Sequence, residues 1–154
     1  MSEHHASVHW MRTSSDFAYE NYNRAHEMRF KDGDIALAAS SAPEFRGDHA
    51  RVDPEEAFVA SCASCHMLSF LAVCARKRLT VDSYEDDAVG YLEKGENGKL
   101  WVARVALKPR VRFATGTNID AAAIARIHHQ SHEECFIANS VKTEIIVESA
   151  RGEH

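Results

Sequence analysis

The chain of 154 residues is long enough for one domain, and its 45% hydrophobic and 27% charged residues are ordinary for a soluble globular protein. The net charge of −5 argues against a nucleic-acid-binding surface, and the lack of 18 consecutive apolar residues argues against a membrane span. The first ten residues lack the pattern of a signal peptide. We therefore predict a cytoplasmic protein with a single domain, residues 1–154, whose four cysteines are reduced, catalytic or metal-bound.

The N-terminal third of the sequence is predicted to form β-strands. Apolar and polar residues alternate over 7–11, "SVHWM", with the period of a strand. Residues 23–30 and 35–40 should form a hairpin, because Asp32–Gly33 between them is a strong turn signal. The segment 41–52 is predicted to be a loop.

Residues 54 to about 77 are predicted to form a long helix. Asp53 is the expected N-cap, Pro54 occupies the first helical position, and Glu56 should close a capping box. Apolar residues occur on nearly every side of this helix, so we expect it to be largely buried.

The rest of the chain predicts a long hairpin, a second helix and a final strand. The hairpin strands cover 80–94 and 100–113, and Asn97–Gly98 between them favours a type I′ turn. The helix should extend from about Asp120 to Glu133 or beyond, and 143–149 should close as a strand. Strands that pair as hairpins, with two helices, predict an α+β fold with antiparallel sheets.

The first helix contains a C-x-x-C motif, "CASC", formed by Cys62 and Cys65. Reactive motifs of this kind usually lie at a helix N-terminus, where the helix dipole lowers the thiol pKa. Here both cysteines fall two to three turns inside the helix, which argues against a thioredoxin-like pair. Cys62 and Cys74 are interpreted as small apolar residues that fill a buried helix.

A second cluster, "HHQSHEEC", places His128, His132 and Cys135 on one face of the second helix. Imidazole and thiolate groups at this spacing could bind zinc, with a fourth ligand from the C-x-x-C motif. The alternative is a polar helix face whose histidines meet water or pack at its end.

A third interpretation joins the two helices. If both pack on one sheet, Cys65 and Cys135 could meet, and a thiolate could attack a peroxide to give a sulfenic acid that the second cysteine converts to a disulfide. The attacking thiol needs a nearby cation, and a buried cation needs a carboxylate. Arg24 and Glu55 are candidates for these two roles.

These residues resemble those of the OsmC/Ohr family, the osmotically inducible and organic hydroperoxide resistance proteins. The family's Pro-Glu followed about ten residues later by the reactive cysteine is similar to Pro54, Glu55 and Cys65. A short His-Glu element precedes the second family cysteine, as at 132–135. The family arginine stands before an Asp-Gly turn, as Arg24 does, although Arg29 lies in the same predicted strand. The resemblance extends from about residue 9 to residue 149.

The resemblance implies a thiol peroxidase for organic hydroperoxides, an antioxidant enzyme of stress response that needs no bound cofactor. It implies that Cys65 attacks, Cys135 resolves to a Cys65–Cys135 disulfide, Arg24 holds the thiolate ionised and Glu55 orients the arginine. It further implies an intertwined homodimer with active sites at the subunit interface, and an external dithiol reductant, lipoylated in some members.

The helix length supports a dimer separately from the resemblance. Glu55 and Cys65 are ten residues apart, which is about 15 Å along a straight helix. A carboxylate does not reach across that distance, so a bend or a second subunit must bring Glu55 to the thiol. A metal-binding protein and a non-catalytic domain that binds an apolar ligand are the competing classes.

Overall fold

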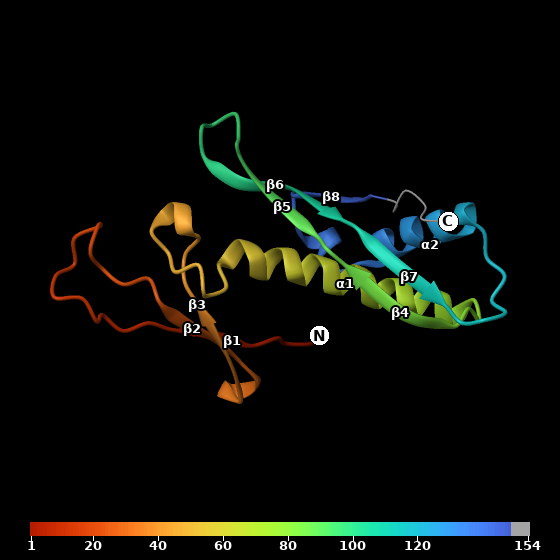
Figure 1. Ribbon diagram of the computed structural model, residues 1–154, viewed down its shortest axis with the longest axis horizontal. Helices are drawn as coiled ribbons and strands as arrows, with labels where there is room; N and C mark the ends of the chain where they lie inside the picture. Colours follow the sequence, from red (N-terminus) through yellow and green to blue (C-terminus); the bar gives the residue numbers. More distant parts are fainter. Residues whose placement is uncertain (149–154) are drawn as a thin grey trace. The chain divides into compact units, whose positions relative to one another are not determined.

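The computed structural model describes residues 1–148, and the chain divides into two compact units, Met1–Ala57 and Phe58–His154. The first unit contains β1 (Ala6–His9), β2 (His26–Phe30) and β3 (Ile35–Ala39) (Figure 1). The helix α1 (Pro54–Arg76) begins in the first unit and lies mostly in the second. The second unit also holds β4 (Val81–Asp86), β5 (Val89–Lys94), β6 (Leu100–Leu107), β7 (Pro109–Phe113), α2 (Ala121–Glu134) and β8 (Glu144–Val147).

The first unit is built on an antiparallel sheet in the order β1-β2-β3. The hairpin predicted at Asp32–Gly33 is confirmed, and Lys31, Asp32 and Gly33 all have positive φ angles in the turn. Glycine adopts this left-handed region without steric cost, which explains its place at φ 101°. The strand predicted from residue 23 is shorter than expected, because β2 begins at His26 and leaves Arg24 in the preceding loop.

The start of α1 confirms the predicted capping box. The Glu56 amide donates to Asp53 Oδ1 at 2.8 Å, and the Asp53 amide donates to Glu56 Oε2 at 3.0 Å. These two bonds satisfy backbone donors that the first helical turn otherwise leaves free. The helix then continues without interruption to Arg76, about one residue short of the predicted end.

The expectation that α1 is largely buried is wrong for the single chain. Its most apolar 18-residue window has a mean hydropathy of 1.8, yet 28% of that window is buried. By length and composition alone such a helix could cross a membrane, although core helices of folded proteins have the same properties. Its buried residues lie along one side of the helix: Cys62, His66, Phe70, Val73 and Cys74.

The long hairpin predicted over 80–113 is divided between two sheets. β4 pairs with β7, whereas β5 pairs with β6, and each pairing contains a bulge. Between β6 and β7, the Lys108 amide donates to the side-chain oxygen Oδ1 of Asp86 at 2.7 Å instead of to a backbone carbonyl of a neighbouring strand. Pro109 has no amide hydrogen and begins β7, a position that tolerates proline.

The turn of the β5–β6 hairpin differs from the prediction. Gly98 has φ 73°, but Asn97 does not have the positive φ that a type I′ turn requires. The Gly95 amide donates to the Lys99 carbonyl at 2.9 Å, and the Gly98 amide to the Gly95 carbonyl at 2.8 Å. This is a longer hairpin loop in which one glycine supplies the left-handed position.

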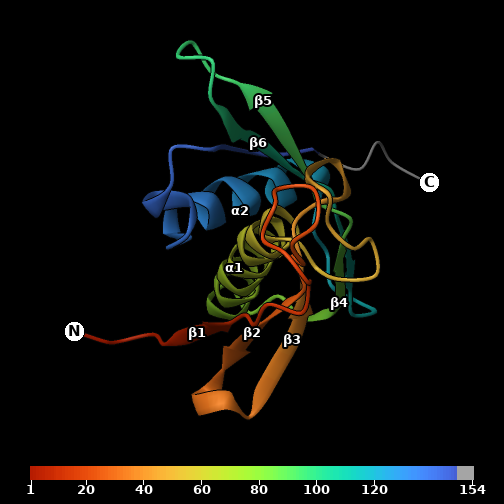
Figure 2. The same ribbon diagram turned by 90° about the vertical axis from the view of Figure 1, so that its left-hand side faces the viewer.

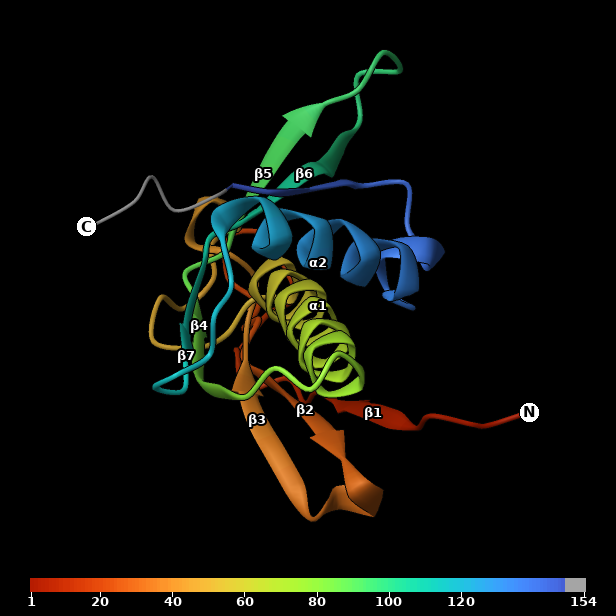
Figure 3. The ribbon, with the colours of Figure 1, turned by 90° about the vertical axis from the view of Figure 1, so that its right-hand side faces the viewer.

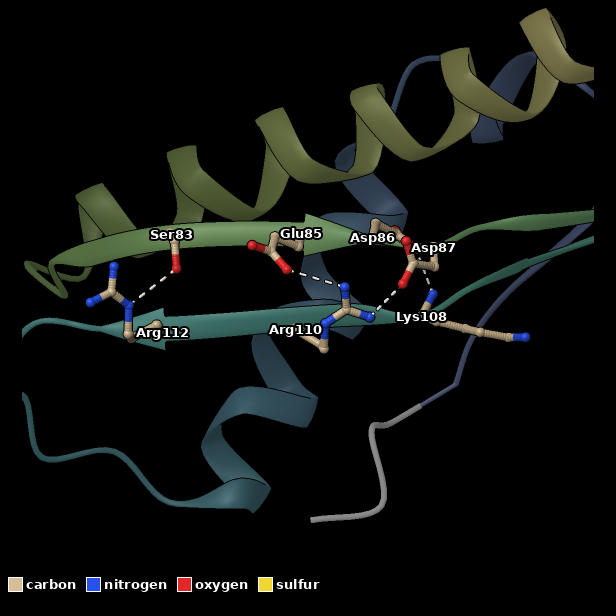
Figure 4. Close-up of polar contacts among 7 residues, drawn as sticks. All are labelled: Ser83, Glu85, Asp86, Asp87, Lys108, Arg110 and Arg112. Carbon is tan, nitrogen blue, oxygen red and sulfur yellow. Dashed lines mark hydrogen bonds and ion pairs between the residues drawn. The ribbon is translucent and has the colours of Figure 1, made fainter. Parts of the chain in front are cut away.

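The two faces of the β4–β7 ribbon have different roles. On one face Tyr84 and Val111 pack against the apolar cluster around Phe70 of α1. On the other face Arg110 bridges Glu85 at 3.1 Å and Asp87 at 2.6 Å (Figure 4). The ribbon therefore covers the second half of α1 and presents charged residues on its outer side.

The second sheet of this unit has the order β5-β6-β8 and mixes strand directions. β8 pairs with β6 in parallel, whereas hairpin pairing predicted antiparallel strands. The parallel direction is possible because the chain passes through α2 before it returns to the sheet (Figure 2). Cys62 of α1 packs with Val105, Leu107 and Ile145 of this sheet. Ser149, the last residue of the predicted final strand, lies outside the described residues.

Candidate functional site

Two cysteines from different helices meet in the second unit. Cys65 lies in the middle of α1, and Cys135 directly follows α2, whose bounds match the prediction to within one residue. α2 lies alongside α1, and Arg76 pairs with Glu134 across them (Figure 3). The two helices therefore bring together thiols that are seventy positions apart in the sequence.

The two thiols occupy different environments. Cys135 is 1% exposed, whereas Cys65 is partly exposed. Burial, and next the interaction with the Cys65 side chain, raises the pKa of Cys135 to about 11. Cys135 therefore remains a protonated thiol at neutral pH.

Backbone amides approach both sulfur atoms. The Ile137 amide donates to Cys65 Sγ, and the Ala138 amide donates to Cys135 Sγ, each at 3.5 Å. Both amides belong to the turn that follows α2. No side-chain pattern in the sequence indicates where a backbone amide points, so this contribution was not predicted.

A cavity of about 550 Å³ opens beside Cys65. Its walls include Leu68 and Phe136, which are 60% and 82% exposed, and the Arg76–Glu134 ion pair lies at its edge. Cys135 is not among the lining residues. The cavity thus gives a small, partly apolar molecule access to Cys65 but not to Cys135.

The other two cysteines belong to the core. Cys62 and Cys74 are both buried, as predicted, and burial raises the pKa of each thiol. Cys62 packs in the cluster with Val105, and Cys74 in the cluster with Phe70. No disulfide links the described cysteines, and the C-x-x-C motif spans one buried and one partly exposed thiol.

The histidines do not form the zinc site considered from the sequence. Within residues 1–148, no three histidine, cysteine or acidic side chains are placed to hold a metal ion. His128 is instead 3.0 Å from His66, measured between Nδ1 and Nε2, and their rings are stacked. His66 was not predicted to take part, although its spacing of four residues from Cys62 places it on the buried face of the helix.

The pair of the buried His66 and the half-buried His128 predicts a loss of stability toward acid. Burial lowers the pKa of both His66 and His128 from 6.5 to about 4. Below pH 6.5 the unfolded chain binds protons that the folded chain does not, so stability falls as pH falls toward 4. We expect the free energy of unfolding to decrease between pH 7 and 5.5, by up to about 1.4 kcal/mol per pH unit for each histidine.

Urea unfolding at several pH values measures this slope. His128→Gln should flatten it, while His129→Gln should leave it unchanged, because the His129 side chain is 77% exposed. Equal slopes for the two variants would show that the buried pair does not control the acid sensitivity.

The first unit places Arg24 in a cavity of its own. Its guanidinium donates to the carbonyls of Tyr22 at 2.7 Å and Tyr19 at 2.6 Å, and lies 3.9 Å from the centre of the Tyr22 ring. The cavity of about 390 Å³ is also lined by Pro54, the first residue of α1. Glu55, the candidate partner of Arg24, is the next residue and is partly exposed.

The alternative arginine is committed elsewhere. Arg29 lies within β2 and pairs with Glu27 at 2.6 Å, and this contact lowers the pKa of the Glu27 carboxyl. Arg24 is therefore the better candidate for a functional cation. The α1 helix between Glu55 and Cys65 is uninterrupted, so no bend in the helix shortens the distance between these two residues.

Comparisons with known proteins point to one family. The family model described as OsmC-like protein matches residues 47–150 of this chain. A search of curated proteins gave no match. The chain is 44% identical to an OsmC-like protein of unknown function from Vibrio cholerae, with a TM-score of 0.89 over 97% of this chain and 100% of that one.

Two more distant structures share the fold. An organic hydroperoxide resistance protein OsmC from Legionella pneumophila is 19% identical, with a TM-score of 0.70 over 97% of this chain and 96% of that one. The organic hydroperoxide resistance protein OhrB of Bacillus subtilis is 18% identical, with a TM-score of 0.68 over 95% and 98%. Together with the two helices and antiparallel-rich sheets, these matches confirm the predicted α+β fold.

Proposed function

We propose that this chain, which belongs to the family of OsmC-like proteins, is a thiol peroxidase that reduces organic hydroperoxides to alcohols. The observation that carries the proposal is the contact between the partly exposed Cys65 and the buried Cys135 beside a cavity. The names of the Legionella and Bacillus proteins, which refer to organic hydroperoxide resistance, agree with it. The free cysteines suit the reducing cytoplasm, where we place the protein.

The proposed reaction uses the two thiols in turn. The Cys65 thiolate attacks the terminal oxygen of the hydroperoxide, the O–O bond breaks, and Cys65 becomes a sulfenic acid while the alkoxide takes a proton to leave as an alcohol. The Cys135 sulfur then attacks the Cys65 sulfur, which releases water and forms a disulfide. An external dithiol reduces this disulfide and becomes a disulfide itself. We include lipoyl groups among the candidate dithiols.

Arg24 and Glu55 complete the proposed site. Arg24 would stabilise the Cys65 thiolate and the negative charge that develops on the departing alkoxide, and Glu55 would orient the guanidinium. Their common support is local: Arg24 and the first residue of α1 line the same cavity in the first unit.

A homodimer is part of the proposal. The apolar α1 helix is buried over 28% of its most apolar window, so a partner subunit would remove further apolar surface from water. The distance between Glu55 and Cys65 on one helix also calls for residues from two chains.

We therefore expect light scattering to give about twice the 17.2 kDa mass of one chain. The measurement should be repeated across a dilution series with peroxidase activity followed in parallel. A fully active species of 17.2 kDa would contradict the shared site.

A peroxidase assay tests the function directly. Consumption of tert-butyl hydroperoxide, cumene hydroperoxide and hydrogen peroxide is compared with dihydrolipoamide as the reductant. We expect faster turnover of the two organic peroxides, because Leu68 and Phe136 give the Cys65 cavity apolar walls. No consumption of any peroxide would favour a non-catalytic binding domain.

The disulfide provides a second test. One equivalent of organic hydroperoxide, added to reduced protein, should link Cys65 to Cys135, because the consecutive amides of Ile137 and Ala138 contact the two sulfur atoms and so place them close together. Peptide mapping by mass spectrometry identifies the pair. If the main product joins Cys62 to Cys65, the assignment of Cys135 as the resolving cysteine is wrong.

A further inference from the structure

The turn after Cys135 is the only segment that brings backbone donors to both sulfur atoms among the described hydrogen bonds. Two consecutive amides, of Ile137 and Ala138, donate to Cys65 Sγ and Cys135 Sγ respectively. Amide donors stabilise a sulfur anion more than a neutral thiol, and they lower the pKa of the sulfur that accepts the bond. Cys65 is the sulfur that must ionise in the proposed reaction.

We propose that the turn of residues 136–140 is a preformed backbone site for the Cys65 thiolate, with the Ile137 amide as its donor and Asn139 and Ser140 as positioning residues. This inference rests on the proposed function for its role in catalysis. It adds a source of thiolate stabilisation that belongs to the second unit and does not depend on Arg24.

The turn is held by bonds that fix its direction. Asn139 Nδ2 donates to the Glu133 carbonyl at 2.8 Å, which ties the turn back to the last residues of α2. Ser140 Oγ donates to the Phe136 carbonyl at 2.7 Å, and the Asn139 amide donates to the Cys135 carbonyl at 3.1 Å. A donor held in place before reaction does not have to reorganise when charge appears on sulfur.

Packing against the hydrophobic core also holds this turn in place. The Ile137 side chain packs on the core cluster that contains Cys62, Val105 and Leu107. The side chain of Phe136, one residue earlier, is 82% exposed and lines the Cys65 cavity. The turn thus alternates an exposed residue, which faces the cavity, with an anchored residue, whose amide meets the thiol.

The protonation of Cys135 fits this arrangement. Burial, and next the interaction with the Cys65 side chain, raises the pKa of Cys135 to about 11, so Cys135 is a neutral thiol at neutral pH. The Cys65 sulfur therefore accepts the Ile137 amide beside a neutral thiol, which would not repel an anion on Cys65 as a second thiolate would.

Ile137→Pro removes the amide donor at a residue whose φ already suits proline. Ile137 has φ −67° and ψ −43°, and proline fixes φ near −65° while it removes the amide hydrogen. Ile137→Ala is the matched control, because it loses the same apolar packing and keeps the amide.

The readout is the pH dependence of alkylation of Cys65 by iodoacetamide, followed by mass spectrometry of the Cys65 peptide. We expect Ile137→Pro to raise the pKa of Cys65 by about one pH unit relative to Ile137→Ala, and to lower the alkylation rate at pH 7 roughly tenfold. The rate should recover above the new pKa. Equal titration curves for the two folded variants would overturn the proposal.

Variants of Asn139 and Ser140 provide a second test if Ile137→Pro does not fold. Asn139→Ala and Ser140→Ala should each raise the pKa of Cys65 by a smaller amount, and Ser140→Thr, which keeps the hydroxyl, should restore it. Phe136→Ala should leave the pKa unchanged, because it alters a side chain and keeps the turn. Unchanged titration in folded Asn139→Ala and Ser140→Ala would also overturn the proposal.

Alkylation separates this inference from the function. The experiment uses no peroxide, so a protein that fails to consume peroxides can still show the shift in Ile137→Pro. Conversely, if the protein consumes peroxides but the turn variants do not change the pKa of Cys65, the proposed function stands and the backbone site for the thiolate is excluded.

Discussion

Cys65→Ser should abolish peroxide reduction, because serine replaces the cysteine that, among the described residues, lines a cavity and lies beside a second thiol. A hydroxyl stays protonated at neutral pH and is a far weaker nucleophile toward a peroxide oxygen than a thiolate. We expect the rate constant to fall by roughly a thousandfold or more, to the background of the free peroxide and reductant. Stopped-flow consumption of cumene hydroperoxide measures it.

Cys135→Ser separates attack from resolution. Cys65 should still react once, so the variant should consume about one equivalent of peroxide and then stop, with Cys65 trapped as sulfenic acid or oxidised further. Mass spectrometry of the intact protein distinguishes these products. Continued turnover at the original rate would mean that Cys135 does not resolve the intermediate.

Cys62→Ala is the matched control for both variants. Cys62 is fully buried against Val105 and Leu107, so its loss should affect packing more than chemistry. Most of the activity should remain, with stability lowered by about 1 kcal/mol for the small volume removed. If Cys62→Ala is as inactive as Cys65→Ser, the spacing from Pro54 has identified the wrong cysteine.

Local sequence signals predicted the elements that carry these thiols. Asp53 and Glu56 form the expected capping box, and both helices begin within one residue of the predicted position. Capping depends on residues three positions apart, so the sequence contains all the information that it needs. The two helices in turn determine which cysteines can meet.

Features that depend on contacts between residues far apart in the chain were not predicted from the sequence. The strands predicted as one hairpin divide near Asp86 and Lys108, where a side-chain bond replaces a strand bond. β8 joins β6 in parallel, a pairing that no turn residue signals. Tertiary packing decides both features, because the same alternating pattern suits either sheet.

The sequence predicted the cysteine side chains of the candidate site, but it did not predict the backbone amides that contact them. Cys65 and Cys135 stand out by residue type, whereas the Ile137 amide and the stacked His66–His128 pair depend on the direction of a turn and the packing of two helices. The roles of Arg24 and Glu55 remain predictions that the structure of one chain does not test.

Arg24→Ala should lower the second-order rate constant with peroxide by roughly a hundredfold or more, the effect of losing one preorganised donor at a site of developing charge. An unperturbed cysteine has a pKa near 8.5, so only a few per cent is thiolate at pH 7. In the proposed site the guanidinium contacts the Cys65 sulfur, so its removal would have two costs: less thiolate, and a less stabilised transition state.

The surroundings of Arg24 suit this role. Carbonyls of Tyr19 and Tyr22 each accept a guanidinium hydrogen, and both tyrosine rings lie against the group. Arginine carries five N–H donors, so these two bonds hold the side chain and leave other donors for a substrate or a thiolate. Lysine has no planar fork, so Arg24→Lys should restore the charge and recover only part of the rate.

The pH profile distinguishes a functional arginine from a structural one. Raising the pH should restore part of the loss in Arg24→Ala, since hydroxide replaces the effect of the guanidinium on ionisation and cannot replace its hydrogen bonds. The Ile137 amide, in the other unit, should keep the variant above the rate of Cys65→Ser. Arg29→Ala is the control, because Arg29 already pairs with Glu27. If Arg24→Ala changes the rate less than about threefold at every pH, far below the loss of a preorganised donor, Arg24 is structural and Arg29 becomes the arginine to test.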